Sequence, residues 1–329
     1  MTATSNKKDS SSCSSSPMYF LGIDGGQSST TALIGDEAGR LLGRGEAGPC
    51  NHVESETGKE KLVGAITQAV AAAAGAAGLA AAVRFAAACC GMSGGPADKR
   101  DLIADLLQAE RLEVTDDAQI ALLGATGGGP GIIVIAGTGS IAHGRNAAGQ
   151  AARAGGWGYI FGDEGGGFDL VRQALRAALR LEEGWGPPTS LLALLLAATG
   201  ASKANQLLHW FYTRDYPRDR VAGYASLVDQ AAHQGDVVAG ALLEQSAQQL
   251  AMLAASVRAQ LFQPGEVVRV SPIGGLFGSR LLSERFRLLV EMEPGAAVSP
   301  ARHEPAAGAL LAAYRSAGLS VSLRIPEAA

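Results

Sequence analysis

The chain has 329 residues, a formal net charge of −4 and 47% hydrophobic residues, which is enough apolar material for two domain cores. No run of Lys and Arg is longer than a pair, which argues against a surface for nucleic acid or for anionic membranes. Aromatic residues make up only 5% of the chain and glycines number 44, so loops that approach a ligand closely are favoured over aromatic platforms that stack bases.

The four cysteines show no metal-ligand spacing. Cys13 lies in a Ser-rich tail, Cys50 stands alone, and Cys89 and Cys90 are adjacent in an apolar run. We therefore expect reduced thiols and a cytoplasmic protein. No segment has the apolar length of a membrane span. Residues 1–17 are polar and lack the apolar middle of a signal peptide, which predicts a disordered tail.

The first part of the chain predicts an α/β unit with the order β-β-β-α-β-α-β. Its helices are marked by a cap at Ser55 or Thr57 and by Pro96 at a first helical position. The expected elements are strands over 18–24, 28–34 and 40–46, a helix over 55–78, a buried strand within 83–95, a helix over 96–111 and a short strand within 112–119.

The pattern partly restarts at residue 131. The expected elements are three strands within 131–156, a long helical region over roughly 165–262, a strand and glycine turn within 266–279, and helices over 279–291 and 305–317. Each half opens with a hairpin whose turn is rich in Gly, Ser and Thr. This repetition predicts a duplicated α/β unit with helical insertions in the second copy.

The two turns, residues 24–30 and 136–140, favour a pair of phosphate-binding loops. A glycine in one hairpin turn often serves only its positive φ. Two such turns at the same place in two repeats instead suggest backbone N–H groups that converge on an anion, with hydroxyls as further donors. Asp24, at the end of the first strand, would hold Mg²⁺ through water. The G-x-G-x-x-G match at 43–48 leads into Pro49, so we interpret it as a chance match.

Five segments, in this order, resemble the N-acetylglucosamine kinase / BadF-type ATPase family of the sugar kinase–Hsp70–actin superfamily: "GIDGGQSSTTALIGDEAGRLLGRGEAGPCNHVE", "VTDDAQIAL", "VIAGTGSIAHG", "GGWGYIFGDEGGGFDLVRQAL" and "PIGGLFGS". The resemblance implies two ribonuclease-H-like (actin-like ATPase) domains around a cleft that binds ATP, Mg²⁺ and a sugar. The first domain would cover 18–127, with a C-terminal helix over 306–318 packed on it, and the second 128–305.

The resemblance also assigns site residues. Asp117 would be the catalytic base, and Asp24 would bind the metal. Asn51 and Asp163 would bind sugar hydroxyls, and the residues expected to contact the nucleotide are Asp24, Gly25, Gly26, Gln27, Ser28, Ser29, Thr30, Gly137, Thr138, Gly139, Ser140, Gly274 and Gly275. Gly166 departs from the family, in which many members have Ser, and this leaves the polar lining of the sugar pocket open.

Two site assignments have structural alternatives. One member of the Asp116–Asp117 pair is expected to cap the following helix, and the residues alone do not say which; the resemblance favours Asp117 as the base. Asp163 and Glu164 could instead complement a helix dipole.

The sugar predicted is N-acetylglucosamine, phosphorylated on its 6-hydroxyl. The neutral residues Ser93, Gly156 and Trp157 suit an acetamide, with Trp157 as an apolar wall. A glucosamine kinase, an ATPase activator of a radical dehydratase and a sugar-sensing repressor are the alternatives. We expect a small amino sugar as partner, with no nucleic acid and no membrane; a homodimer stays open.

Overall fold

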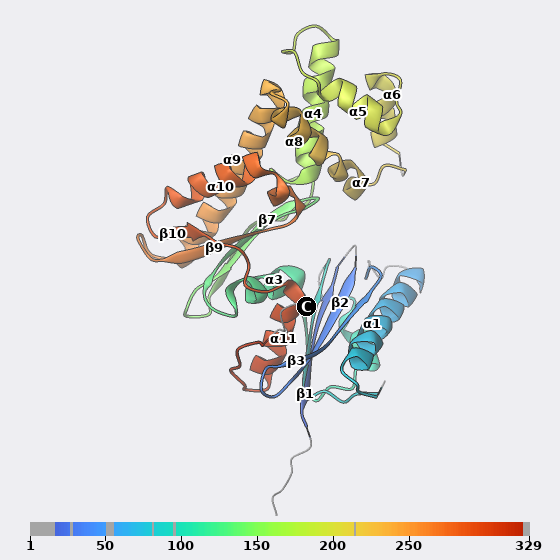
Figure 1. Ribbon diagram of the computed structural model, residues 1–329, viewed down its shortest axis with the longest axis vertical. Helices are drawn as coiled ribbons and strands as arrows, with labels where there is room; N and C mark the ends of the chain where they lie inside the picture. The colour runs from blue at the N-terminus through green and yellow to red at the C-terminus, as the bar shows by residue number, and fades with distance from the viewer. Residues whose placement is uncertain are drawn as a thin grey trace, which may run out of the picture. The chain divides into compact units, whose positions relative to one another are not determined.

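A computed structural model describes residues 17–26, 29–50, 56–80, 82–94, 97–213 and 215–324. The chain divides into two compact units (Figure 1). Unit 1 runs up to Val114 and resumes at Ala312; unit 2 runs from Thr115 to Leu311. The domain boundary expected from the sequence lies after residue 127, and it stays a prediction. The predicted tail, except Pro17, lies outside the described residues.

Unit 1 is built on a five-stranded sheet with the strand order β3-β2-β1-β4-β5. The first three strands are antiparallel, and β4 is parallel to β1. Every residue of β4 is buried, as expected for a central parallel strand. The elements are β1 (Tyr19–Gly25), β2 (Thr30–Asp36), β3 (Leu41–Ala47), α1 (Glu56–Ala76), β4 (Ala87–Met92), α2 (Arg100–Leu106) and β5 (Leu112–Asp116).

Unit 2 repeats this topology. Its strand order, β10-β9-β6-β7-β8, is that of unit 1 read from the opposite edge. The hairpin strands β6, β7 and β8 are again antiparallel, and β9 is parallel to β6. The predicted duplication is therefore confirmed. The strands are β6 (Gly131–Ala136), β7 (Ser140–Arg145), β8 (Ala151–Gly155), β9 (Val268–Ile273) and the unpredicted β10 (Ala296–Val298).

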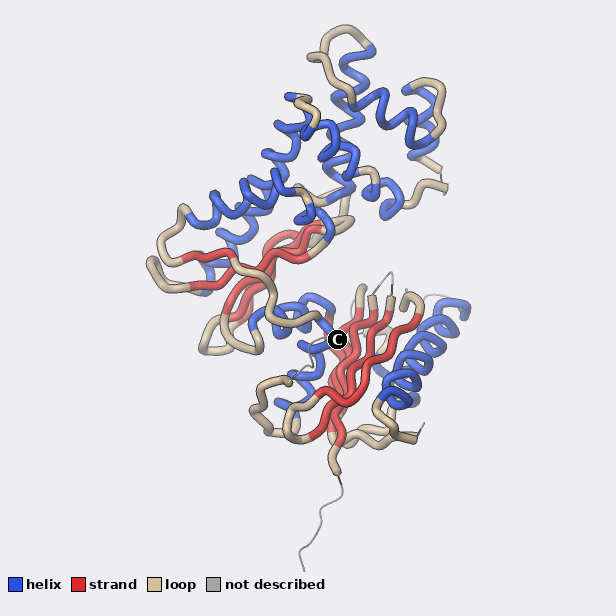
Figure 2. Tube along the Cα trace, viewed as in Figure 1, coloured by secondary structure: helices blue, strands red, loops and turns tan. Residues whose placement is uncertain are grey.

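The helices of unit 2 cover its sheet and form a helical insertion (Figure 2). α9 and α10 pack on the sheet around one apolar core, which includes Leu250 and Phe286, while α4 to α7 enclose a second core around Leu195 and Leu207. The helices are α3 (Asp117–Thr126), α4 (Gly167–Glu182), α5 (Leu191–Thr199), α6 (Ala204–Phe211), α7 (Arg218–Gly223), α8 (Ala225–His233), α9 (Val237–Leu261), η1 (Gly275–Gly278), α10 (Arg280–Glu291) and α11 (Pro305–Ser316), whose last turn belongs to unit 1.

Within the described ranges, we find no single helix with the length and apolar character to cross a membrane. α5 and α6 meet that test only when taken as a pair, bent by 62°.

Several element boundaries differ from the sequence analysis, and the largest difference is in the helix expected over 96–111, which ends at Leu106. The second strand begins at Thr30 and not at Ser28. The helix expected from Pro96 begins at Arg100, so the prediction of Pro96 as its first residue is wrong; Pro96 itself lies outside the described residues. Lys99 precedes this helix, with its buried ammonium group 2.9 Å from a carboxylate oxygen of Asp98.

The glycines of the G-x-G-x-x-G match have a packing role in unit 1. A Cβ atom added to Gly43 would lie 2.1 Å from the carbonyl oxygen of Ala73, and one added to Gly45 would lie 2.1 Å from that of Ala69. Both positions face α1, so β3 contacts the helix backbone directly. The interpretation that this match is no dinucleotide-binding motif is consistent with these contacts.

Asp236 is the N-cap of α9, and its carboxylate makes the stability of the protein depend on pH. Asp236 accepts hydrogen bonds from the backbone N–H groups of Ala239 and Ser190 and from the hydroxyls of Thr189 and Ser190. Burial alone would raise the pKa of Asp236, but these donors outweigh it and lower the pKa from its ordinary value of 3.8 to about 2. The folded protein therefore stabilises the carboxylate form of Asp236. The contribution of this carboxylate to the free energy of unfolding is complete above about pH 4 and is lost as the pH falls towards 2.

We expect Asp236→Ala to destabilise the protein by roughly 1–3 kcal/mol at neutral pH, because a helix cap and the anchor of residues 189–190 are both lost. Urea unfolding over a pH series checks this. Asp236→Asn is the matched control, since Asn also caps helices but does not ionise. A gap between wild type and Asp236→Asn that does not narrow between pH 4 and pH 2 would contradict the assignment.

Candidate active site

The turn between β6 and β7 is hydrogen-bonded to the start of α4. Gly137 donates its N–H to the carbonyl oxygen of Gly139 across the turn, at 3.0 Å. The N–H groups of Gly167 and Phe168 donate to the carbonyl oxygens of Gly137 and Thr138, at 2.8 and 3.0 Å. These bonds occupy the carbonyl oxygens of the turn from the α4 side. Residues 137–139 are half-buried, so the predicted second phosphate loop is a fixed, partly accessible backbone turn.

Asp163 lies directly against this turn. A Cβ atom added to Gly139 would lie 2.4 Å from the Oδ2 atom of Asp163, so a larger residue at this position would require the carboxylate to move. The Oδ1 atom accepts a long hydrogen bond, 3.4 Å, from the N–H of Ser140. Asp163 has φ +63°, a left-handed conformation that is uncommon for a residue with a side chain. The structure therefore brings one predicted sugar-binding residue into contact with the predicted phosphate loop.

Two predicted phosphate donors have inward-facing hydroxyls. Thr30 is fully buried; its hydroxyl donates to the carbonyl oxygen of Gly48 at 2.8 Å and contacts the sulfur of Cys50 at 2.9 Å. The hydroxyl of Ser140 donates to the carbonyl oxygen of Glu164 at 2.7 Å. Both hydroxyls stabilise their own unit. These bonds do not support the expectation that the two hydroxyls donate to phosphate.

A cavity of about 480 Å³ adjoins the second loop in unit 2. Two predicted nucleotide-contacting residues of the turn, Gly137 and Thr138, line it, together with Gly275. Gly274 has φ +110°, and a Cβ atom there would lie 2.3 Å from the carbonyl oxygen of Ala136. This glycine lets the chain after β9 pass close to the end of β6. The cavity is also lined by Leu170, Asp219, Ala222, Gly223, Ala225, Ser226, Asp229, Leu243, Leu276, Gly278 and Ser279.

The first predicted loop is described only in part, because Gln27 and Ser28 lie outside the described residues. The predicted sugar-binding residue Asn51 also lies outside them. Gly26 donates its N–H to the carbonyl oxygen of Ser29, at 2.9 Å. A Cβ atom on Gly25 would lie 2.6 Å from the sulfur of Met92, so a larger residue at this position would require the Met92 side chain to move. Ser93 donates its N–H to the carbonyl oxygen of Gly25 at 3.0 Å, which places a predicted sugar-binding residue beside the loop. Asp24 sits near the end of β1, as predicted.

The two adjacent carboxylates before α3 have different positions. Asp116 is the N-cap: its Oδ1 atom accepts from the N–H of Gln119 at 2.8 Å, and its Oδ2 atom from the side-chain amide of Gln119 at 3.0 Å. Asp117 is the first residue of α3 and is half-buried. The predicted capping role therefore falls to Asp116, while the assignment of Asp117 as the catalytic base stays a prediction.

The remaining predicted sugar residues lie in the loop after β8. Gly156 has φ +71° and packs on Ile141, while Trp157 is 66% exposed with the Arg153 guanidinium 4.8 Å from its ring centre. Gly166 is the N-cap of α4, and a Cβ atom there would lie 2.7 Å from the backbone of Gly139. The glycine at position 166 therefore allows the start of α4 to pack closely against the turn at residues 137–139.

The described residues contain no group of three or more His, Cys, Asp or Glu side chains able to hold a metal by themselves. Mg²⁺ is commonly bound by one or two carboxylates together with substrate phosphates and water. Asp24, near the end of β1, is a carboxylate that could serve as such a ligand. The residues present therefore fit a magnesium ion that arrives with a nucleotide.

Comparison with known proteins identifies the family of this chain. The model of the BadF/BadG/BcrA/BcrD ATPase family matches residues 21–313. The chain belongs to this family. It is 30% identical to an N-acetylmuramic acid/N-acetylglucosamine kinase of Clostridium acetobutylicum, over 90% of this chain and 98% of the relative. It is 29% identical to an N-acetyl-D-glucosamine kinase of Dictyostelium discoideum, over 90% and 98%.

A solved structure of a candidate N-acetylglucosamine kinase from Chromobacterium violaceum is also similar to this BadF-type chain. It has a TM-score of 0.72 and 29% identity, and the similarity covers 89% of this chain and 98% of that one. The predicted fold of two ribonuclease-H-like, actin-like ATPase domains is confirmed by this similarity and by the two equivalent sheets.

Several residues of this BadF-type site were missed from sequence. Asp219, Ser226, Asp229 and Ser279 line the cavity but come from polar helices and a helix cap, which carry no recognisable motif. The cavity residues that the sequence did predict are Gly137 and Thr138, through "VIAGTGSIAHG", and Gly275, through "PIGGLFGS".

Proposed function

We propose that this protein transfers the γ-phosphate of ATP to the 6-hydroxyl of N-acetylglucosamine. Its class is that of the ATP-dependent sugar kinases, to which its relatives and the solved sugar-kinase structures of similar fold belong. The observation that carries the proposal is the backbone turn at residues 137–139 on the wall of the 480 Å³ cavity. Such a turn suits phosphate groups, and the cavity beside it has room for a nucleoside.

The lining of the cavity indicates which part of ATP it takes. Among the described residues that line the cavity there is no Lys, Arg or His, but there are two acidic residues, Asp219 and Asp229. An anionic group is disfavoured there, while the adenine and ribose supply neutral hydrogen-bond donors. We therefore place adenosine in the cavity, between Gly275 and the turn, and the phosphates along residues 137–139.

The transfer itself needs alignment, charge neutralisation and a proton acceptor. In this proposal Asp117 accepts the proton of the 6-hydroxyl as its oxygen attacks the γ-phosphorus and ADP leaves. Mg²⁺ supplies charge neutralisation at the phosphates when bound. Asp163, with Asn51 and Ser93, orients the sugar through its hydroxyls.

The acetamide preference rests on neutral surroundings. Glucosamine carries a positive charge and favours a nearby carboxylate, whereas an acetamide needs neutral hydrogen-bond partners and an apolar wall. Trp157 offers such a wall, since 66% of it is exposed. Glucosamine is the runner-up substrate.

An ATPase activator of a radical dehydratase would hold an iron–sulfur cluster between two subunits through cysteines. Cys50, Cys89 and Cys90 are free thiols, and all three are buried. Burial raises the pKa of Cys89 and Cys90, which disfavours thiolate ligands. These positions favour the kinase over the activator, and reduced thiols are consistent with a cytoplasmic protein.

The substrate proposal is tested by ADP release with N-acetylglucosamine, glucosamine, N-acetylmannosamine, N-acetylmuramic acid and glucose. We expect the highest kcat/KM with N-acetylglucosamine, because that ratio reports differential binding of the transition state. A Trp157→Ala variant should narrow the ratio between N-acetylglucosamine and glucosamine. A higher kcat/KM for glucosamine at neutral pH would make the protein a glucosamine kinase on the same scaffold.

A further inference from the structure

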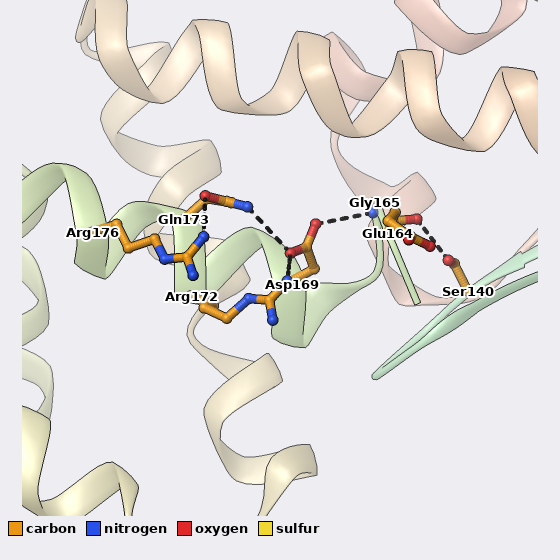
Figure 3. Close-up of polar contacts among 7 residues, drawn as sticks. All are labelled: Ser140, Glu164, Gly165, Asp169, Arg172, Gln173 and Arg176. Carbon is orange, nitrogen blue, oxygen red and sulfur yellow. Dashed lines mark hydrogen bonds and ion pairs between the residues drawn. The ribbon is translucent and has the colours of Figure 1, made fainter. Parts of the chain in front are cut away.

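We propose that Asp169, in the first turn of α4, is a positioning residue that holds Asp163 against the second phosphate loop. Asp169 acts through the backbone, because its Oδ2 atom accepts the N–H of Gly165 (Figure 3). The inference rests on the proposed function, in which Asp163 binds the sugar.

Asp163 needs an external constraint. Among the described residues, Asp163 is the only non-glycine residue with a positive φ. This conformation is unfavourable for such a residue and persists only where the surrounding structure fixes it. Among the described residues the carboxylate accepts one long hydrogen bond, at 3.4 Å from the N–H of Ser140, so the constraint comes from the backbone on either side. On the preceding side the N–H of Gly162 donates to the carbonyl oxygen of Gly158 at 2.8 Å.

The following residues are fixed one after another. The carbonyl oxygen of Glu164 accepts from the Ser140 hydroxyl at 2.7 Å, and the N–H of Gly165 donates to the Oδ2 atom of Asp169 at 3.2 Å. The N–H of Gly166 donates to the carbonyl oxygen of Asp163 at 3.0 Å. Ser140 ties the segment to β7, and Asp169 ties it to α4.

Asp169 is itself held in place. Its Oδ1 atom accepts from Arg172 at 2.6 Å and from the amide of Gln173 at 3.4 Å, which leaves Oδ2 for Gly165 (Figure 3). Its side chain is only 13% exposed. A carboxylate in the first turn of a helix that accepts a backbone N–H from the preceding chain resembles a capping box. Here Gly166, the N-cap, has no side chain to share that task.

Two variants separate positioning from simple helix stabilisation. Asp169→Ala removes the bonds from Gly165, Arg172 and Gln173. In Asp169→Asn the amide oxygen can still accept from Gly165, but the ion pair with Arg172 is lost. Glu182→Gln, an exposed carboxylate at the other end of α4, is the matched control. Hydrogen exchange of the peptide over residues 163–167 and the steady-state kinetics with N-acetylglucosamine are the readouts.

We expect faster exchange at residues 163–167 in Asp169→Ala, with KM for the sugar raised about tenfold to a hundredfold and KM for ATP changed far less. Asp169→Asn should restore a large part of the sugar affinity, and Glu182→Gln should match wild type. If Asp169→Ala fails to fold, Asp169→Asn carries the comparison with a smaller shift in the same direction.

Unchanged exchange would overturn the proposal, and so would faster exchange with an unchanged KM for the sugar. Equal rises in KM for sugar and ATP would also overturn it, because they would indicate general loosening of unit 2. Failure of the proposed function would look different: wild type itself would phosphorylate no amino sugar, and the exchange comparison would still decide whether Asp169 holds the segment.

Discussion

Replacing Asp117 by Asn is expected to lower kcat by roughly two to four orders of magnitude, the scale of a lost general base. Asn at the first position of α3 keeps the size of the side chain but cannot accept the proton of the sugar hydroxyl. The KM for ATP should change little, because the nucleotide is assigned to the cavity beside residues 137–139. Steady-state kinetics with N-acetylglucosamine and ATP measure this loss.

Asp116→Asn is the matched control for that variant. Asp116 caps α3 through Gln119, and Asn is an equally good cap, so we expect most of the activity to remain. The reverse result, with a large loss in Asp116→Asn and near-normal turnover in Asp117→Asn, would exchange the roles of the two carboxylates.

The second large effect concerns the fold of unit 1. Gly45→Ala would place a methyl group 2.1 Å from the carbonyl oxygen of Ala69 and 2.4 Å from the backbone nitrogen of Ala73. The obstacle is helix backbone, which cannot rotate away, so β3 and α1 must separate. Overpacking of this kind costs about 3 kcal/mol, and we expect the thermal and urea midpoints to fall accordingly.

Gly48→Ala provides the comparison, since a Cβ atom at Gly48 meets nothing within 4 Å. Its unfolding midpoints should stay near those of wild type. Midpoints for Gly45→Ala that match those of Gly48→Ala would show that β3 does not lie directly on α1, and the packing explanation of the glycines at 43 and 45 would be wrong.

The fold was predictable because its signals are local and repeated. Apolar runs such as residues 87–92 and 131–136 predicted the central strands, and the two glycine-rich turns revealed the duplication. β10 was missed because three residues carry too little pattern, and the start of α2 was misplaced because a Pro that suits a helix start also suits the turn before it.

The candidate site was less predictable, because its roles depend on contacts between distant segments. Thr30 and Ser140 look like phosphate donors in sequence, yet their hydroxyls bond to Gly48 and Glu164. The sequence could not decide which carboxylate caps α3, and the bond between Asp116 and Gln119 answers that. Asp169 carried no signal at all, because its role comes from the backbone of Gly165.

The most direct test of the proposed activity is the identity of the product. Wild-type protein would be incubated with N-acetylglucosamine, ATP and Mg²⁺, and the product examined by phosphorus NMR with proton coupling and by mass spectrometry. The proposal predicts a monophosphate whose phosphorus couples to the two protons on carbon 6, formed in equal amount with ADP. A phosphate on another hydroxyl, or ADP released without any phosphorylated sugar, would contradict it.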